Sequence, residues 1–280
     1  MLKIVDIEQH TPEWHAWRKG KIGASMIAGI MGISPFSNQT PLKIFNQMIE
    51  GSETTPNEHM IRGTELEPIA RDRFNQKCNT NYQPACIESV EFPYMICSLD
   101  GYSPYEEIKI IEIKCPSVQK SMIPDHYFAQ MQFQMFILGE DKAIYVSYSQ
   151  GDLIDMVVHR DDLFIEKMLI AVKAFKRSLD AFEPPEPIKG DLVEIYDPEA
   201  HLKAQELKSI RATIKSLEKE ECRIKKELIA IANGSQSLIG DVKILYQKNK
   251  DKIDYESIPV LKDMDLTPWK KPGAQFWKIV

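Results

Sequence analysis

The sequence predicts a mixed α/β fold of the α+β kind, with a central mixed sheet flanked by helices. Segments of helical and of strand periodicity alternate over the first two-thirds of the chain. The 280 residues, 43% of them hydrophobic, can bury one sizeable core. No apolar run reaches the roughly eighteen residues that a transmembrane helix needs, so we expect no membrane span.

The N-terminal half begins with a short strand at residues 3–8 and a helix that starts at Thr11-Pro12-Glu13. Threonine caps a helix and proline suits its first turn. Helical periodicity then marks three further segments, at 24–31, 41–50 and 58–78. From residue 87 the period changes to two, and Asp100-Gly101 ends that strand as a turn.

The next strand is predicted at 108–115, and a strong helix at 124–139 ends on Gly139, a typical helix terminator. Two strands at 143–149 and 153–159 and a helix at 162–182 complete this part. The stiff PPEP sequence at 184–187 predicts a domain boundary, which divides the chain into residues 1–187 and 188–280.

Residues 188–280 are expected to form a helix at about 199–232, a hairpin at about 242–258 and a tail. Apolar residues on this helix follow alternating spacings of three and four, with Glu221 as the interruption: Leu207, Ile210, Ile214, Leu217, Ile224, Leu228 and Ile231. Such a seam could form a dimer or trimer, dock on a partner or pack on the chain's own hairpin. The break at Glu221 favours internal or partner packing.

The net charge and the cysteine content exclude some classes of protein. The net charge of −6 argues against a generally basic surface, so any nucleic-acid contact must use a local groove. The five cysteines have no CxxC spacing, which predicts a reducing, cytoplasmic protein without a zinc or iron–sulfur site. They also lack the cysteine cluster of iron–sulfur nucleases.

The stretch CSLDGYSPYEEIKIIEIKCP, residues 97–116, carries the strongest chemical signal. In a strand, Glu112 and Lys114 point to the same side about 6.6 Å apart, while Ile111, Ile113 and Cys115 point to the opposite, buried side. Asp100 ends the preceding strand of an expected antiparallel pair and can lie beside Glu112. Two carboxylates and the Ile113 carbonyl make a half-site for Mg²⁺.

Lys114 completes this set, because an ammonium group can hold or deprotonate a water, or stabilise charge on a phosphate. The alternative is an ordinary polar face of an edge strand, with Asp100 a mere turn residue. Asp100-Gly101 at the end of one strand and Glu112-x-Lys114 on the next are the arrangement that this chemistry needs, which favours the metal site.

Five ordered motifs carry a family resemblance: WHAWRKGKIGAS (14–25), RGTELEPIAR (62–71), CSLDG (97–101), EIKCP (112–116) and YFAQMQFQM (127–135). They resemble the YqaJ-type viral recombinase, or phage lambda exonuclease-like, family of the PD-(D/E)xK nuclease superfamily. The resemblance covers about residues 5–180 and implies a restriction-endonuclease-like core. Leu99 departs from the proline that the superfamily usually has there.

The resemblance implies Asp100 and Glu112 as metal ligands and Lys114 as the catalytic lysine. It adds Glu67 as a carboxylate for a second metal or its water, and Gln130 as the residue that orients the attacking water. The residues alone leave other interpretations open. Glu67 could be a surface pair with Arg71, and Gln130 could belong, with Gln134, to a solvated helix side.

Further family positions imply contacts with DNA. Arg18, Ser25 and Ser98 match a pocket for a terminal 5′-phosphate, and Tyr127 lies one turn before Gln130. An arginine and two hydroxyls suit a dianionic phosphate, and Ser25 begins an expected helix. Arg18 could equally be a solvated cation at a helix end. The six histidines show no ligand spacing, and Trp14 and Trp17 are interpreted as packing residues.

Taken together, the resemblance implies a Mg²⁺-dependent exonuclease, with Mn²⁺ as a substitute, that degrades one strand of duplex DNA from a 5′-phosphorylated end. The 3′ overhangs would serve recombination with a single-strand annealing partner, and a trimeric ring is implied. The alternatives are an endonuclease of restriction or repair type, or a DNA-binding module of the same fold without activity.

Overall fold

The computed structural model describes residues 2–51, 57–119, 122–192, 195–247 and 258. The chain divides into two compact units, Met1–Glu194 and Ile195–Val280. Within the described part, no helix is long and apolar enough to cross a membrane.

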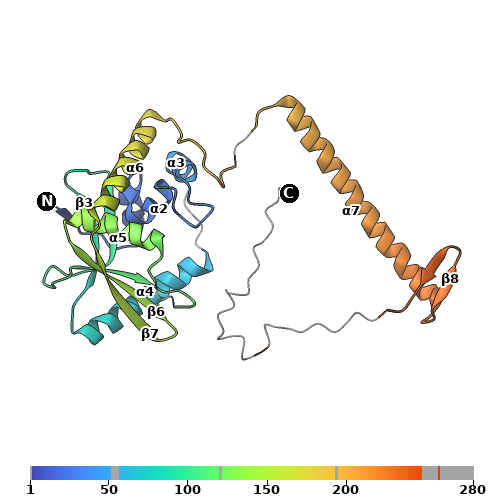
Figure 1. Ribbon diagram of the computed structural model, residues 1–280, viewed down its shortest axis with the longest axis horizontal. Coiled ribbons are helices and arrows are strands. Elements are labelled where there is room, and N and C mark those ends of the chain that lie inside the picture. Colours follow the sequence, from blue (N-terminus) through green and yellow to red (C-terminus); the bar gives the residue numbers. More distant parts are fainter. Residues whose placement is uncertain (1, 52–56, 120–121, 193–194, 248–257, 259–280) are drawn as a thin grey trace. The chain divides into compact units, whose positions relative to one another are not determined.

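The first unit is built on one seven-stranded mixed sheet (Figure 1). Six strands follow the order β1-β3-β4-β5-β6-β7, and β2 also pairs with β4. Their bounds are β1 Leu2–Val5, β2 Ile22–Gly23, β3 Gln83–Ser89, β4 Met95–Tyr102, β5 Ile110–Lys114, β6 Lys142–Ser149 and β7 Asp152–His159. Only β2–β4 and β5–β6 pair in parallel among these strands.

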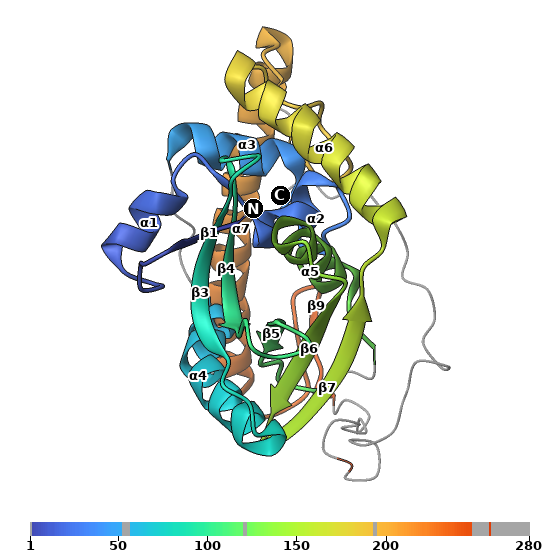
Figure 2. The same ribbon diagram turned by 90° about the vertical axis from the view of Figure 1, so that its left-hand side faces the viewer.

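The helices cover both faces of this sheet (Figure 2). The larger core packs α2 (Ile27–Ile30), α3 (Pro41–Glu50), α5 (Asp125–Leu138) and α6 (Asp162–Ala181) against one face. On the other face, α4 (Glu58–Cys78) packs Ala70 and Phe74 against Ile111, Ile113 and Val146. The sheet is therefore buried on both sides.

Local signals explain where these helices begin and end. The Thr11 side chain accepts the Trp14 amide at the start of α1 (Pro12–Arg18), with Pro12 in its first turn as predicted. Gly139 ends α5 with φ +70°, a conformation that costs glycine nothing. The predicted helix at 24–31 is split into a 3₁₀ turn, Ala24–Met26, and the short α2.

The central position of β5 differs from one expectation. β5 lies between β4 and β6, and four of its five residues are buried, including Glu112 with no exposed surface. The edge-strand interpretation is therefore wrong, and the side of Glu112 and Lys114 is not a solvent face. The reason is that α4 and α5 cover opposite faces of the same strand.

The second unit contains α7 (Pro198–Ala232), a single helix of 35 residues, and a small hairpin. The hairpin pairs β8 (Ser237–Ile239) with β9 (Val242–Ile244), which confirms a C-terminal hairpin but places its first strand before the predicted range of 242–258. Gly240 provides the turn with φ +58°, which the lysine-rich sequence further on had obscured. Most of the predicted second strand lies outside the described residues.

The end of the first unit is held by Asp191. Its carboxylate accepts hydrogen bonds from the Thr40 hydroxyl and from the Ile188 amide, and Lys43 donates to the Gly190 carbonyl. The Asp191 side chain is only 1% exposed. Residues 188–191 thus pack with the first unit, whereas the division into functional domains at 187 stays a prediction.

Candidate active site

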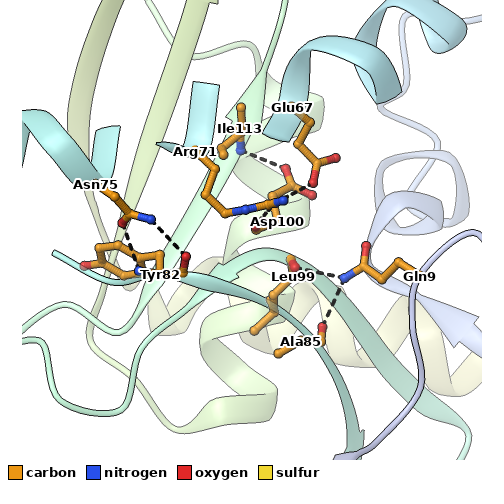
Figure 3. Close-up of polar contacts among 9 residues, drawn as sticks. All are labelled: Gln9, Glu67, Arg71, Asn75, Tyr82, Ala85, Leu99, Asp100 and Ile113. Atoms are coloured by element: carbon orange, nitrogen blue, oxygen red, sulfur yellow. Dashed lines mark hydrogen bonds and ion pairs between the residues drawn. The ribbon is translucent and has the colours of Figure 1, made fainter. Parts of the chain in front are cut away.

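The site forms where β4 and β5 separate. Their antiparallel ladder pairs Gly101 with Ile111 and Tyr102 with Ile110. Extending this register by one step would set Asp100 opposite Glu112. At this step the Asp100 side chain makes the hydrogen bond to β5: its Oδ2 accepts from the Ile113 amide at 2.8 Å (Figure 3). A side chain thus replaces a backbone partner, which holds the Asp100 carboxylate against β5.

Gly101 makes this close approach of the strands possible. A Cβ atom at this position would lie 2.4 Å from Ile111 Cγ1 and 3.0 Å from Tyr82 Cβ. Both neighbours are buried and cannot easily yield. The Asp-Gly pair that sequence analysis interpreted as a turn therefore lies within β4, and its glycine serves packing between strands.

Glu112 is held by three donors. Its Oε1 accepts from Lys114 Nζ and, at 2.6 Å, from Gln130 Nε2. Its Oε2 accepts from Gln134 Nε2, also at 2.6 Å. Gln130 and Gln134 are one turn apart on α5, and Gln134 is fully buried. The solvated interpretation of these two amides is therefore wrong, because α5 turns them onto the sheet.

The two carboxylates share a buried environment. Burial first, and then the charge of Glu112, raise the pKa of Asp100 well above its ordinary value. Burial alone would lower the pKa of Lys114, but the charges of Glu112 and Asp100 outweigh it and raise this pKa. Lys114 is therefore held as an ammonium ion, with the Tyr127 ring 5.1 Å from its Nζ.

Glu67 reaches the same region from α4. Arg71 NH1 donates to Glu67 Oε1 at 2.9 Å and to the Asp100 carbonyl at 2.6 Å (Figure 3). The ion pair with Arg71 exists, but it is not a surface pair, since Arg71 is only 9% exposed. It ties α4 to the end of β4.

A cavity of about 150 Å³ joins this region to the predicted phosphate residues. Its walls include Asp100, Glu67 and Gln130 together with Arg18, Ser25 and Ser98. The structure thus brings together six residues from four segments of the sequence that lie between positions 18 and 130. The contacts described above connect this cavity to four further residues: Glu112, Ile113, Lys114 and Tyr127.

Trp14 arranges the phosphate side of the cavity. Its indole Nε1 donates to Ser98 Oγ at 2.9 Å, and the Arg18 guanidinium lies 4.3 Å from its ring. In the described part of the chain no carboxylate pairs with Arg18, and burial lowers its pKa. A half-buried, unpaired guanidinium is a good site for an anion. Ser25 is exposed at the cavity rim.

Sequence reasoning missed four residues around the site. Gln134 orients Glu112, Trp14 orients Ser98, and Arg71 holds Asp100. Gln9 Nε2 bonds the carbonyls of Ala85 and Leu99, where the register of β3 and β4 shifts (Figure 3). The spacing of Trp14 and Arg18 by one turn was a usable signal, whereas the contacts of Gln9 span more than seventy residues.

Among the described residues, no group of three or more His, Cys, Asp or Glu side chains is arranged to hold a metal ion. The pair Asp100 and Glu112 nevertheless fits a divalent cation. Both groups are hard oxygen donors, Glu112 is fully buried and Asp100 partly so, and each lies beside the other's negative charge, which a cation would offset. Glu67 is paired with Arg71, so we do not count it as a direct ligand of this cation.

Comparison with known proteins bears directly on this site. Residues 13–141 match the sequence model of the YqaJ-like viral recombinase domain. The resemblance to the YqaJ-type recombinases is confirmed. The matched segment contains every site residue considered above except Gln9.

Two crystal structures of one similar protein extend the comparison. The alkaline exonuclease LHK-Exo from Laribacter hongkongensis is 29% identical, over 62% of this chain and 94% of its own, with a TM-score of 0.54. Its complex with dAMP has the same identity and coverage and a TM-score of 0.53. A search of curated protein sequences finds no significant match. The predicted fold class is confirmed, and the likeness supports a nuclease of the recombinase type.

Proposed function

We propose that this protein is a metal-dependent 5′-to-3′ exonuclease that degrades one strand of linear duplex DNA from a 5′-phosphorylated end. The product is a 3′ single-stranded overhang for recombination. One observation carries the proposal: a single cavity joins the carboxylate site at Asp100 to the unpaired guanidinium of Arg18. The YqaJ-like match and the likeness to an alkaline exonuclease support the same chemistry.

Asp100 and Glu112, with the Ile113 carbonyl, would hold Mg²⁺, for which Mn²⁺ would substitute. When bound, the cation neutralises charge on the scissile phosphate and makes the attacking water more acidic. Lys114, held as an ammonium beside Glu112, donates to a phosphate oxygen or to that water. It acts as a charge rather than as a base in this arrangement.

Gln130 and Glu67 have supporting roles. The Gln130 amide nitrogen is bonded to Glu112, which leaves its Oε1 to accept a hydrogen bond from the attacking water. Glu67, fixed by Arg71, contributes negative charge toward water around the metal rather than a direct ligand bond. Tyr127, over the Lys114 ammonium, lies where it can contact the DNA strand.

Arg18, Ser25 and Ser98 would bind the terminal 5′-phosphate. A phosphate seated there places the next phosphodiester bond over the carboxylates, because one cavity connects both sets. The phosphate thus selects the end and positions the chain. A charge-assisted contact of this kind contributes about 1.5–3 kcal/mol.

The decisive experiment follows product length on linear duplexes that differ only in their 5′-phosphate. With Mg²⁺, the wild type should start faster on phosphorylated ends, and Arg18→Ala should erase most of this preference. Lys114→Ala should abolish cleavage but retain DNA binding, while Lys109→Ala, whose partner is Glu140, should cleave normally. Internal cuts, or equal rates on both ends, would favour an endonuclease; no cleavage at all would indicate a binding module.

A further inference from the structure

The helix α7 presents an apolar seam that the described residues of its unit, 195–247 and 258, leave exposed. Five seam residues are between 43% and 69% exposed: Ile210, Ile214, Leu217, Ile224 and Ile231. Ala232, in the last turn, is the residue of α7 that is buried, next to the hairpin that follows it. The expected packing of the seam on the hairpin is therefore not seen among the described residues.

The seam repeats every seven residues without a break in the helix. Leu207, Ile214, Glu221 and Leu228 occupy the first core position, called a, and Ile210, Leu217, Ile224 and Ile231 the second, called d. Helices with this pattern bury the seam against partner helices of the same kind. Glu221 interrupts the seam but not the helix, and Lys225 pairs with it at 2.6 Å one turn later.

The charges that flank the seam select one partner and one direction. The flanking position g carries Glu206, Thr213, Glu220 and Glu227, and the flanking position e carries Arg211, Glu218, Lys225 and Ala232. In a parallel pair, each g residue meets the e residue five positions later in the other chain. This sets Glu206 against Arg211 and Glu220 against Lys225, and no g residue meets an e residue of like charge.

An antiparallel pair is disfavoured by the same residues. There g residues face g residues, and every charged g residue of α7 is a glutamate. Glutamates would then face each other in any register, which is unfavourable. A parallel pair also faces Glu221 with its own copy, and this one like-charge contact in the seam weakens the pair.

We propose that α7 pairs in parallel and in register with α7 of a second copy of this chain, through the seam from Leu207 to Ile231. This surface is independent of the nuclease site. Both first units then join the paired helices at the same end, because each precedes its own α7.

Disulfide trapping in the full chain tests the pairing. The exposed Cys78 and Cys222 are first replaced by serine. Leu207→Cys should then form an inter-chain disulfide readily under mild oxidation, whereas Ser209→Cys, off the seam in the same turn, should form several-fold less. In an antiparallel pair centred on the seam, the two copies of residue 207 would lie about 36 Å apart and could not link.

Matched variants separate the seam from general surface effects. Ile214→Asp should reduce Leu207→Cys trapping to the Ser209→Cys level, while Ile229→Asp, 60% exposed but off the seam, should leave it unchanged. Circular dichroism should show that α7 stays helical in both variants. Glu220→Lys should weaken trapping, and adding Lys225→Glu should restore it.

Three results would overturn the proposal. Trapping of Leu207→Cys no better than Ser209→Cys would mean that another segment or another protein covers the seam. Equal effects of Ile214→Asp and Ile229→Asp would exclude the seam as the contact. Stronger association of Glu220→Lys would indicate an antiparallel pair.

Discussion

Glu112 owes its orientation to two amides on one turn of α5, of which Gln134 is the more deeply buried. The Gln134 Oε1 atom is buried without a hydrogen-bond partner, so the side chain bears a cost for holding Glu112. Gln134→Leu should therefore lower kcat by about 10- to 100-fold, as is common when a group that orients a metal ligand is lost.

Gln132 is the matched control for this prediction. It is equally buried on the same helix, but it bonds the His159 carbonyl and the Asp161 amide instead. Gln132→Leu should lower the melting temperature and leave kcat nearly unchanged. Equal losses of kcat in both variants would assign Gln134 a structural role only.

Glu88 makes the stability of the first unit depend on pH. The hydrogen bond from Lys21 is the largest cause that lowers the pKa of Glu88 below its ordinary value of 4.5, and burial opposes it. A carboxyl with a lowered folded pKa contributes stability that is present above the unfolded pKa and lost as the pH falls through the folded value. The contribution is therefore lost as the pH falls below 4.5 and through the lowered pKa of Glu88.

Glu88→Gln should accordingly reduce the free energy of unfolding at pH 7 by about 1 kcal/mol, a value kept small because both partners retain some solvent contact. The difference from wild type should vanish in acid. Glu107→Gln, at an 86% exposed side chain paired with Lys142, should change little at either pH. A Glu88→Gln effect as large in strong acid as at pH 7 would contradict the assignment.

The contact of β4 with β5 depends on a glycine that no side chain can replace. Gly101→Ala would place a methyl group 2.4 Å from Ile111 Cγ1, so the strands must move apart at Asp100. We expect a loss of about 1–3 kcal/mol in unfolding free energy, together with a loss of cleavage. Urea unfolding and the nuclease assay measure the two effects.

Gly63 offers the opposite outcome within α4. An added Cβ there meets no atom within 4 Å, and the residue lies inside a helix. Gly63→Ala should stabilise the protein by about 1 kcal/mol, since alanine favours helix more than glycine does. If Gly63→Ala and Gly101→Ala changed the free energy of unfolding in the same direction, the close approach of the strands at Gly101 would not explain the effect of Gly101→Ala.

The whole molecule divides at a point that truncation can test. A chain ending at residue 192 retains Asp191, which anchors the end of the first unit to Thr40. It should keep metal-dependent cleavage of short duplexes. A chain ending at Pro187 should cleave as well when folded, but unfold at lower temperature, because the Asp191 contacts contribute about 1–3 kcal/mol.

Two outcomes would change this view. Loss of cleavage in a folded chain ending at residue 192 would mean that the second unit or an obligate oligomer completes the site. Equal melting temperatures for both truncations would show that Asp191 contributes nothing to the first unit.

Patterns within short stretches of the sequence determined where most helices of this protein lie. Helices α1, α3, α4, α5 and α6 follow from caps, periodicity and terminators that lie within a few residues, such as Thr11 at α1 or Gly139 at α5. The same is true of α7, predicted at about 199–232 and found at Pro198–Ala232. Local hydrogen bonds and apolar periodicity are written in consecutive residues, so one sequence suffices to find them.

Only the tertiary structure decided which candidate residues meet. Arg18 and Asp100 line one cavity although 82 positions separate them, and Glu112 is buried because α4 and α5 cover both faces of β5. The amides of Gln130 and Gln134 turn inward for the same reason. Burial and long-range hydrogen bonds depend on how elements pack, and a lone sequence records the period of a strand but not what lies above and below it.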